Sequence, residues 1–348
     1  MNKYPIKIAI CGFGRFAKKR ILPAINTSDK LELAAIIDRD LDKFKLPANV
    51  LRFNSVNELL NSSGIDSVYI ATPNYLHASQ TIKFLKKGFH VLCEKPMAIN
   101  KNDCLMMIQT AKENNLQLSI GHMLRYSDSI NKVRDLIKSN KLGTILSLEL
   151  VFNYDIKFTE RDWVDSKKYS GGGALIDAGI HCIDVVQFLL DTSITLKNID
   201  YMKANEKNIE NEIKCSFLSE DINCSIKINS NMKHETSLVI ISSSGKLILK
   251  NFASTSGSVQ INFLSSTNPS KSYVIEVDVA RTYLNQINNF ANSIFSGKYD
   301  YSHAKNATEA IGIIEEVYET SKLSIIQWKI NTIIYKVIKY EIKKLSNL

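Results

Sequence analysis

Residues 6–17 have the sequence IKIAICGFGRFA, in which a short β-branched run leads directly into two closely spaced glycines. Gly12, Gly14 and Ala17 have the G-x-G-x-x-G/A spacing of a dinucleotide-binding turn between a strand and a helix. Gly12 permits the tight turn, Gly14 lets backbone amides approach a pyrophosphate, and Ala17 lets the helix pack closely on the strand. The helix N-terminus then offers unpaired N–H groups to the anion. The segment therefore predicts a parallel α/β domain that binds a dinucleotide.

An acidic residue, Asp38, stands at the end of the second predicted strand, 31–37. A carboxylate at this place accepts hydrogen bonds from the adenosine ribose diol and repels a 2′-phosphate, which favours NAD over NADP. Arg39 beside it is able to pair with such a phosphate, so NADP stays open. An ordinary strand-end acid is the alternative interpretation of Asp38.

Strand-like and helix-like segments alternate over residues 1–120, which is the pattern of a parallel sheet covered by helices. Residues 194–277, in contrast, form mostly successive strand-like runs, which favours an antiparallel sheet with one packed face. The predicted fold class is an N-terminal α/β doubly wound domain followed by an α+β domain with a large, open, mostly antiparallel sheet. The predicted domains are residues 1–122 and 123–324, followed by a helix over 325–348.

The helix predicted over 325–348 is basic and amphipathic. Ile330, Ile334, Val337 and Ile338 share one of its faces, and its lysines lie largely elsewhere. Such a helix suits an anionic membrane surface. Packing on the protein or on a neighbouring subunit is the interpretation that we favour.

Composition excludes several classes of protein. Of 348 residues, 45% are hydrophobic and 23% are charged, which is the balance of a globular chain rather than a disordered one. The formal net charge is +9, but Lys and Arg are scattered, so nucleic acid binding is not predicted. No apolar run approaches the ~20 residues that span a bilayer, and no leader is visible, which predicts a cytoplasmic protein. The six cysteines lie far apart without a CxxC pair, which argues against a disulfide framework and a metal site.

Three further motifs follow the glycine-rich turn in order. Residues 71–77 read ATPNYLH, residues 88–96 read GFHVLCEKP, and residues 171–184 read GGGALIDAGIHCID. Together they resemble the signatures of the Gfo/Idh/MocA oxidoreductase family, which includes glucose–fructose oxidoreductase and inositol dehydrogenase. The resemblance implies a Rossmann domain that binds a nicotinamide cofactor. It also implies a second domain whose open sheet floors the active site and often mediates oligomers.

The resemblance assigns catalytic roles to Lys95, Asp177 and His181. Alcohol oxidation requires a base for the hydroxyl proton while hydride leaves the carbon, and ketone reduction requires the reverse. The imidazole of His181 suits proton transfer because its unperturbed pKa lies nearest to physiological pH. The ammonium of Lys95 polarises the reacting oxygen. Asp177 precedes His181 by four residues on the same helix face, where it either orients the imidazole or accepts a substrate hydroxyl.

Cofactor contacts are predicted from the glycine-rich turn and from the resemblance. Four residues, Thr72, Pro73, Asn74 and His77, match the family's loop that lines the cofactor, and Glu94 matches an acid near the nicotinamide ribose. Thr72 and Pro73 also suit a helix start, and Glu94 also suits pairing with a nearby base. Lys95-Pro96 is expected to be a cis peptide, as in relatives. The predicted cofactor-binding residues are Gly12, Phe13, Gly14, Arg15, Phe16, Asp38, Arg39, Thr72, Pro73, Asn74, His77 and Glu94.

Two residues are expected to contact the substrate. Arg125 follows the last strand of the first domain, where relatives often carry a substrate-binding arginine, although the proline usual shortly after it is absent. Trp163 stands where relatives often have Trp-Arg, but Val164 replaces that arginine, so one substrate contact is expected to be missing. Core packing is the alternative for Trp163. No metal ligand is predicted.

The leading prediction is an NAD(P)-dependent dehydrogenase or reductase that acts on a secondary hydroxyl or ketone of a sugar, cyclitol or sugar nucleotide. Two alternatives stay open: an NAD-dependent glycoside hydrolase that uses transient oxidation without net redox change, and a non-catalytic NAD-binding regulatory subunit. A homo-oligomer, dimer or tetramer, is expected, with a small-molecule substrate and neither nucleic acid nor a membrane span.

Overall fold

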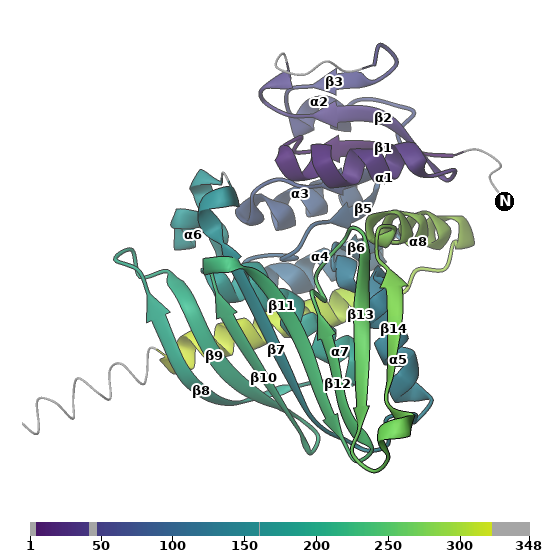
Figure 1. Cartoon of the computed structure of the whole chain (residues 1–348). Helices are drawn as coiled ribbons and strands as arrows, with labels where there is room; N and C mark the ends of the chain where they lie inside the picture. The colour runs from purple at the N-terminus through teal and green to yellow at the C-terminus, as the bar shows by residue number, and fades with distance from the viewer. Residues whose placement is uncertain (1–4, 42–46, 160, 322–348) are drawn as a thin grey trace, which may run out of the picture.

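The computed structural model describes residues 5–41, 47–159 and 161–321. The amphipathic helix predicted over 325–348 lies outside the described residues. Figure 1 shows a smaller sheet at the top, built from the N-terminal part of the chain, and a large open sheet below it, with helices between and beside them.

Six parallel strands form the N-terminal sheet, in the order β3-β2-β1-β4-β5-β6. In this doubly wound order the ligand crevice lies at the carboxyl ends of β1 and β4, where the strand order reverses. The prediction of a doubly wound domain is confirmed. The elements are β1 (Ile6–Cys11), β2 (Leu31–Ile37), β3 (Leu51–Phe53), β4 (Ser67–Ile70), β5 (His90–Cys93), β6 (Leu118–Ile120), η1 (Ala17–Ile21), α1 (Leu22–Thr27), α2 (Val56–Leu60), α3 (Asn74–Lys86) and α4 (Lys101–Glu113).

The structure differs from the sequence prediction at two places in this domain. Strand β3 was not predicted, because its three residues lie at the sheet edge, largely exposed, and lack the apolar run of a buried strand. The helix expected over 15–26 contains the π-helical turn η1 before α1. Pro23 lies in the first turn of α1, where its missing N–H costs no hydrogen bond.

Eight strands form the second sheet, in the order β14-β13-β12-β11-β7-β10-β9-β8. Strands β7 and β10 pair in parallel, and the other neighbours pair antiparallel, which confirms the predicted sheet. Along β9, buried Ile213, Cys215 and Phe217 alternate with half-buried residues, so one face packs and the other is open. The strands are β7 (Ile145–Asp155), β8 (Thr195–Ala204), β9 (Glu210–Ser219), β10 (Ile222–Asn229), β11 (Asn231–Ser242), β12 (Gly245–Lys250), β13 (Ser258–Ser265) and β14 (Tyr273–Asp278).

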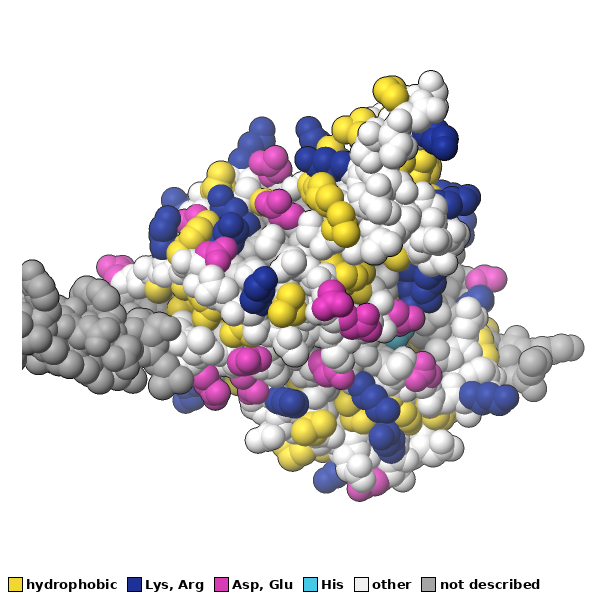
Figure 2. Space-filling view, turned by 90° about the horizontal axis from the view of Figure 1, so that it is seen from below, with side chains coloured by type: hydrophobic (Ala, Val, Ile, Leu, Met, Phe, Trp, Pro, Cys, Tyr) yellow, Lys and Arg dark blue, Asp and Glu magenta, His cyan; other side chains and the backbone are white. Residues whose placement is uncertain are grey.

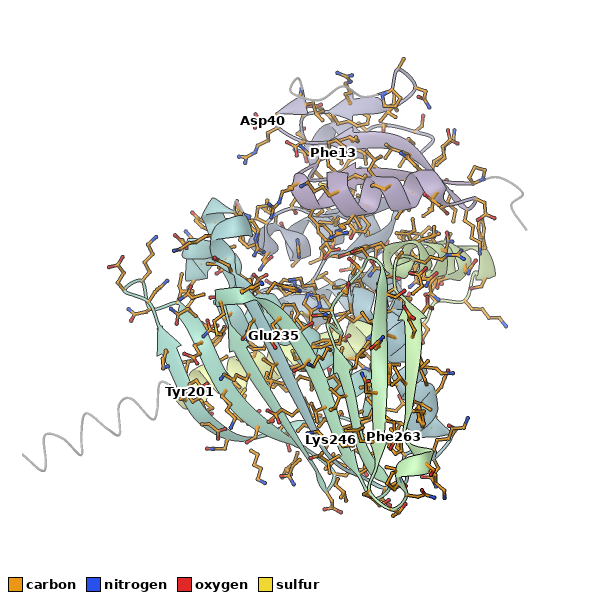
Figure 3. All side chains as sticks on the ribbon, in the orientation of Figure 1. Phe13, Asp40, Tyr201, Glu235, Lys246 and Phe263 are labelled. Atoms are coloured by element: carbon orange, nitrogen blue, oxygen red, sulfur yellow. The ribbon has the colours of Figure 1, made fainter. Side chains whose placement is uncertain are left out.

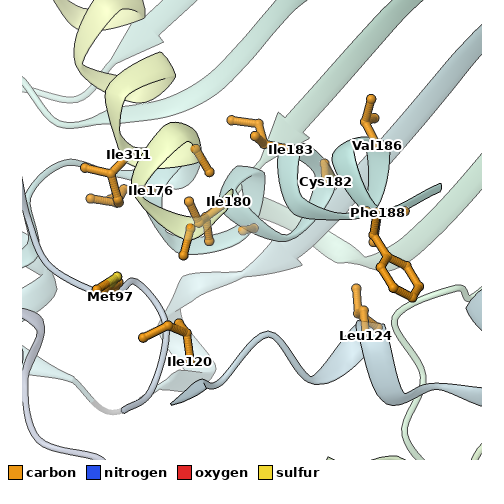
Figure 4. Packing of buried hydrophobic residues seen from close by; sticks show 14 of the residues in the cluster. Met97, Ile120, Leu124, Ile176, Ile180, Cys182, Ile183, Val186, Phe188 and Ile311 are labelled. Carbon is orange, nitrogen blue, oxygen red and sulfur yellow. The ribbon is translucent and has the colours of Figure 1, made fainter. Parts of the chain in front are cut away.

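Helix α7 (Ile180–Leu190) is buried between the large sheet and the N-terminal domain. Figure 4 shows Ile176 and Ile180 near Met97 and Ile120 of the N-terminal domain and near Ile311 of the last described helix, 302–321. The stretch 167–190 is the one helical stretch among the described residues that is long and apolar enough to cross a membrane, but 89% of its apolar window is buried in the protein. The shorter elements around it are η3 (Met123–Tyr126), α5 (Asp128–Lys138), η4 (Ile156–Thr159), η5 (Asp162–Asp165), α6 (Lys167–Ser170), η6 (Leu175–Gly179) and η7 (Pro269–Lys271).

Helix α8 (Thr282–Ser296) follows the last strand of the second sheet but packs against the first domain. Ile287 and Phe290 share a buried cluster with Ile8 and Ile21. The chain thus returns to the N-terminal domain, as Figure 1 shows. The domain boundaries stay a prediction, since this helix, assigned from the sequence to the second domain, contributes to the core of the first.

Charged side chains of both signs are interspersed with hydrophobic ones on the face drawn in Figure 2. Some basic residues are paired: the Lys203 ammonium lies 2.8 Å from Glu212, and the Lys207 ammonium lies 2.8 Å from Asp165. Exposed pairs of this kind are screened by solvent and contribute little to stability. On this face the positive charge is therefore spread out rather than gathered in a block.

Candidate active site

Loops from neighbouring strands meet at the carboxyl edge of the N-terminal sheet. The Gly12 N–H donates to Ile37 O at 2.9 Å, and the Glu94 N–H donates to Ile70 O at 2.9 Å. These bonds extend the strand pairing into the loops, so the loops after β1, β2, β4 and β5 are held side by side. This edge is where a doubly wound sheet binds its ligand.

The glycine-rich turn has the geometry that a dinucleotide requires. Gly12 has a φ of +91°, and a Cβ there would lie 2.7 Å from Ala71 O, whereas a Cβ on Gly14 would meet nothing within 4 Å. The Asp38 carboxylate accepts the Phe13 N–H at 2.7 Å, which fixes the acid beside the turn. The close approach at Gly12, the open space at Gly14 and the carboxylate at the end of β2 fit the pyrophosphate and the ribose of a dinucleotide.

Replacing Gly12 by alanine is expected to lower the free energy of unfolding by about 2–5 kcal/mol, because the new Cβ meets the Ala71 backbone and the left-handed φ is strained. Urea unfolding measures the change. Gly14→Ala is the matched control: it is expected to leave stability within about 1 kcal/mol of wild type while weakening dinucleotide binding. Equal stability of the two variants would contradict this account of the turn.

His77 joins the two loops that flank the crevice. Its Nδ1 lies 2.7 Å from Pro96 O and its Nε2 lies 2.8 Å from Thr72 O, and the side chain is buried. Burial lowers the pKa of this imidazole. Asn74 is buried as well, and its Nδ2 donates to Ser170 O at 2.8 Å, across to the second domain. Both residues, predicted to line the cofactor, therefore hold the loops in place.

Glu94 is a buried carboxyl group beneath the crevice. It accepts the Tyr69 hydroxyl, and its Oε2 accepts the Lys95 N–H at 3.1 Å. A Cβ on Gly121 would lie 2.9 Å from this side chain, so the carboxyl is closely packed. Burial raises the pKa of Glu94 to about 7. Tyr69 had no signal of its own in the sequence, because it stands within the apolar run of a buried strand.

The remaining predicted cofactor residues lie on the rim of the crevice. Arg15 and Arg39 are exposed, as is Phe16, which makes an edge-on contact with Tyr283 of α8 at a ring separation of 5.7 Å. Burial raises the pKa of the Tyr283 hydroxyl. Tyr283 had no signal in the sequence, because only the return of α8 brings it to the glycine-rich turn.

Lys95 and Asp177 meet across the interface between the two domains. The Lys95 ammonium donates to Asp177 O at 2.7 Å and to Asp177 Oδ1 at 3.2 Å. The Lys95-Pro96 peptide is cis, as expected. Arg161 binds the same carboxylate with two nitrogens, at 3.0 and 2.6 Å. Burial alone would raise the pKa of Asp177, but the charges of Arg161 and Lys95 hold it well below its usual range.

His181 is buried beside this cluster. Its ring stacks on Phe152 with a centroid separation of 6.0 Å, and its Nδ1 has no hydrogen-bond partner among the described residues. Burial, together with the nearby Lys95 charge, lowers the pKa of His181 well below its ordinary value, so the imidazole is neutral at physiological pH. The described residues show no hydrogen bond between Asp177 and His181, because the carboxylate is engaged by Lys95 and Arg161. The structure thus gives no support to the interpretation in which Asp177 orients the imidazole.

Close packing fixes the start of the helix that carries these residues. A Cβ on Gly172 would lie 2.0 Å from the Tyr318 hydroxyl, and one on Gly173 would lie 2.1 Å from Glu210 O. The buried Glu210 carboxylate accepts the N–H groups of Gly173 at 2.9 Å and Leu175 at 3.1 Å. Glu210 had no signal in the sequence, because its partners come from distant segments. The next turn, η6, is π-helical, a form that is frequent at functional sites.

Arg125 is paired with an acid of the second domain. Its guanidinium forms a buried ion pair with Asp184, with Nε 2.9 Å from Oδ1 and a terminal nitrogen at 2.8 Å. His122 Nδ1 lies 3.6 Å from the same carboxylate. Burial lowers the pKa of His122 to about 4. The sequence did not reveal which buried acid faces Arg125, and its role in substrate binding stays a prediction.

Trp163 lies in η5, close to the catalytic candidates. The position after Trp163 is occupied by the uncharged Val164, as the sequence indicated. Arg161, two residues before Trp163, nevertheless brings a guanidinium to Asp177, and this group lies 5.5 Å from the Trp163 ring centroid. Arg161 was not predicted from the sequence, because its partner Asp177 lies on a different element.

The described ranges contain no group of three or more His, Cys, Asp or Glu side chains arranged to hold a metal ion. The absence of a metal stays a prediction. The six cysteines are free and buried.

The doubly wound sheet carries this turn at its crevice, and the helical segment η6–α7 of the second domain brings Asp177 and His181 to the same place. This arrangement defines a two-domain dinucleotide-binding protein. The chain belongs to the Gfo/Idh/MocA family. The model of the oxidoreductase family with an NAD-binding Rossmann fold matches residues 6–122, and the model of the Gfo/Idh/MocA C-terminal domain matches residues 130–248. The resemblance noted in the sequence is confirmed, and the first domain is an NAD-binding Rossmann domain.

Similar proteins include two enzymes of known activity. The chain is 34% identical over 215 residues to glucose-6-phosphate 3-dehydrogenase of Bacillus subtilis (strain 168), covering 59% of this chain and 60% of that one. It is 31% identical over 187 residues to 2,7-anhydro-N-acetylneuraminate hydratase of Escherichia coli (strain K12), and the match covers 53% of this chain and 50% of that one. The chain thus matches about half to three fifths of the length of these curated relatives.

A solved structure shares the fold over most of both chains. KijD10, a 3-ketoreductase from Actinomadura kijaniata in complex with NADP and TDP-benzene, superposes with a TM-score of 0.80 at 19% identity. The match covers 88% of this chain and 95% of that one.

Proposed function

We propose that this protein is an NAD(P)-dependent oxidoreductase that transfers hydride between the nicotinamide and a secondary hydroxyl or ketone of a sugar, cyclitol or sugar nucleotide. One observation carries the proposal: the Lys95 ammonium, 2.7 Å from Asp177 O, stands at the crevice edge beside the buried, neutral imidazole of His181. Oxidation of a carbinol requires two groups: a cation that polarises the hydroxyl oxygen of the substrate and a base that accepts the hydroxyl proton.

Each residue of the cluster has a separate task in this proposal. A bound nicotinamide cofactor supplies the hydride acceptor or donor. Lys95 donates a hydrogen bond to the reacting oxygen, and the neutral His181 accepts the hydroxyl proton during oxidation and returns it during reduction. Asp177 stays ionised and acts only as a hydrogen-bond acceptor, for Lys95 and for a neighbouring substrate hydroxyl.

The two alternative functions find less support. The names of the relatives given above describe a dehydrogenase, a hydratase and a ketoreductase, and none is a glycoside hydrolase or a regulatory subunit. A non-catalytic subunit would also have no need of a lysine, a carboxylate and a histidine together at the crevice.

Spectrophotometry tests the proposal directly. Purified protein is incubated with NAD⁺, NADP⁺ or the reduced forms and with a panel of sugar phosphates, nucleotide sugars and cyclitols, and the absorbance of the reduced nicotinamide is followed. Native mass spectrometry of the purified protein identifies a retained cofactor. Absence of cofactor binding together with no absorbance change for any substrate would refute the proposal. A retained cofactor with product formed at constant absorbance would indicate chemistry without net redox change.

Asp38 is expected to make NAD the preferred cofactor. Its carboxylate is fixed by the Phe13 N–H at 2.7 Å, next to the position of the adenosine ribose. Asp38→Ser should lower kcat/KM for NAD⁺ by about 10- to 100-fold and raise that for NADP⁺, because a hydrogen bond to a charged group and a repulsive charge are both lost. Glu32→Ser, on the exposed side of β2, is the control. An unchanged ratio of the two kcat/KM values in Asp38→Ser would contradict this role.

We also infer that the protein forms a homo-oligomer through the open face of the second sheet and acts in the cytoplasm. Exposed Ile241 of β11, Leu264 of β13 and Val274 of β14 support the first inference, because apolar groups gathered on one face mark an interface. Light scattering after gel filtration measures the subunit number, and a monomer at micromolar concentration would exclude the oligomer.

A further inference from the structure

A cavity of about 460 Å³ lies between α5 and the β13–β14 edge of the large sheet. In Figure 3 its lining residue Phe263 lies toward the lower end of β13, whereas Phe13 of the glycine-rich turn lies in the upper domain. The cavity is therefore separate from the cofactor crevice. Its volume is within the range of small-molecule sites. The lining residues are Lys132, Leu136, Lys141, Ser244, Phe263, Ser265, Thr267, Lys271, Tyr273 and Ile275.

The charge of this cavity is of one sign. Lys132, Lys141 and Lys271 line it, and none of its lining residues is acidic. Among the described residues, none of the three ammonium groups has an ion pair, although Lys203 and Lys207 elsewhere on the second domain do. Three like charges around one hollow create a positive potential that attracts an anion.

The floor of the cavity is apolar and carries one unsatisfied polar group. The rings of Phe263 and Tyr273 stack at 5.1 Å with an interplanar angle of 28°. The Tyr273 hydroxyl is buried and has no hydrogen-bond partner among the described residues. A buried hydroxyl without a partner is unfavourable, so a ligand acceptor at this place would be stabilised.

We propose that this cavity binds a small organic anion that combines an apolar ring with a phosphate or carboxylate. The ring lies on the Phe263–Tyr273 pair, and the anionic group is held by the three lysines and the Tyr273 hydroxyl. The site is independent of the proposed redox function, since none of its residues lies in the crevice.

Calorimetric titration with phenyl phosphate tests this site, with inorganic phosphate and phenol as separate probes. Phenyl phosphate should bind more tightly than inorganic phosphate or phenol alone. Its affinity should be unchanged in the presence of saturating NADH. Lys132→Glu/Lys271→Glu should weaken binding at least tenfold, and Tyr273→Phe, which keeps the ring, should weaken it several-fold. Lys86→Glu, on exposed α3 of the other domain, should bind like wild type. No binding, loss of binding with NADH, or equal affinity in the double variant would overturn the proposal.

A second inference concerns Arg161 and rests on the proposed function. Its guanidinium makes two hydrogen bonds to the Asp177 carboxylate, which also accepts from Lys95 at 3.2 Å. All three side chains are largely buried, with exposed fractions of 28%, 18% and 17% for Arg161, Asp177 and Lys95. Without Arg161, one ammonium would be the sole cationic partner of this carboxylate.

We infer that Arg161 is a positioning residue, which fixes the Asp177 carboxylate so that the Lys95 ammonium is directed at the crevice. A planar guanidinium suits this task, because two parallel N–H bonds set the orientation of a carboxylate as a single ammonium does not.

Kinetics of Arg161→Met test this role. The variant should lose about 10- to 100-fold in kcat with unchanged affinity for NADH, and added guanidinium chloride should restore part of the loss. Arg161→Lys should be intermediate and serves if the methionine variant folds poorly. Wild-type kcat in Arg161→Met, or a loss that guanidinium does not restore, would overturn the inference.

A second readout separates this inference from the proposed function. The stability difference between wild type and Arg161→Met should be full above the ordinary pKa of an aspartate, about 3.9, and shrink as the pH falls below it. The reason is that the pairing lowers the pKa of Asp177 only in the folded state, so its contribution declines as the unfolded chain takes up the proton. If the protein has no redox activity but shows this pH-dependent difference in stability, the pairing is retained and only the proposed function is refuted. A difference that does not depend on pH would refute the pairing.

Discussion

Lys95→Met is expected to lower kcat by about 10³-fold while the affinity for NADH changes by less than about threefold. The ammonium is the group placed to donate to the reacting oxygen, 2.7 Å from Asp177 O, and methionine keeps the length of the side chain without its charge. The cofactor crevice is built from the glycine-rich turn and Asp38, which the substitution does not touch. Stopped-flow single turnovers give the chemical step, and NADH fluorescence gives the affinity.

Lys83→Met is the matched control for this experiment, because Lys83 is exposed on α3 of the same domain. Its kcat should equal that of wild type. A Lys95→Met enzyme within tenfold of wild-type kcat would show that the ammonium is not part of the chemistry. Loss of NADH binding in the same variant would show instead that Lys95 holds the cofactor.

His181→Asn is expected to lower kcat by about 10²- to 10⁴-fold, because the amide offers no basic nitrogen for the hydroxyl proton. Oxidation by the wild type should also keep its rate in mildly acidic solution. Burial lowers the pKa of His181, so the imidazole stays unprotonated where an exposed histidine would already be charged, and the rate falls only when the pH passes below this lowered pKa. A pH series of kcat for the alcohol substrate measures both effects.

His234→Asn controls for packing in the histidine experiment, because His234 also contacts the Phe152 ring but is exposed on β11. It should leave kcat and its pH dependence unchanged. A wild-type kcat that declines with an apparent pKa of about 6.5 would mean that the base is a solvated imidazole rather than the buried His181.

Short-range patterns accounted for the parts of the molecule that depend on local chemistry. The β-branched run with its two glycines predicted β1, its turn and the helix after it, since strand, turn and helix are adjacent in the chain. The resemblance indicated that Lys95, Asp177 and His181 belong to one site. The structure brings them into one cluster, with a direct contact between the first two.

Pairings between distant segments could not be predicted. The pairing of Arg125 with Asp184 of α7 was not predicted, because periodicity does not reveal which buried charges pair. Arg161 was missed for the same reason, because its partner Asp177 lies on a different element. Strand β3 was missed because an exposed edge strand of three residues has no apolar signature.

The return of α8 to the first domain has a consequence for how the protein can be divided. A recombinant fragment that ends at residue 122 would lack Ile287 and Phe290, so the side of the Rossmann unit that holds Ile8 and Ile21 would be left open to water. Helix α8 thus links the second domain to the core of the first. The stability of the first domain therefore depends on a segment from the end of the chain, and a fragment of this domain expressed by itself should carry α8.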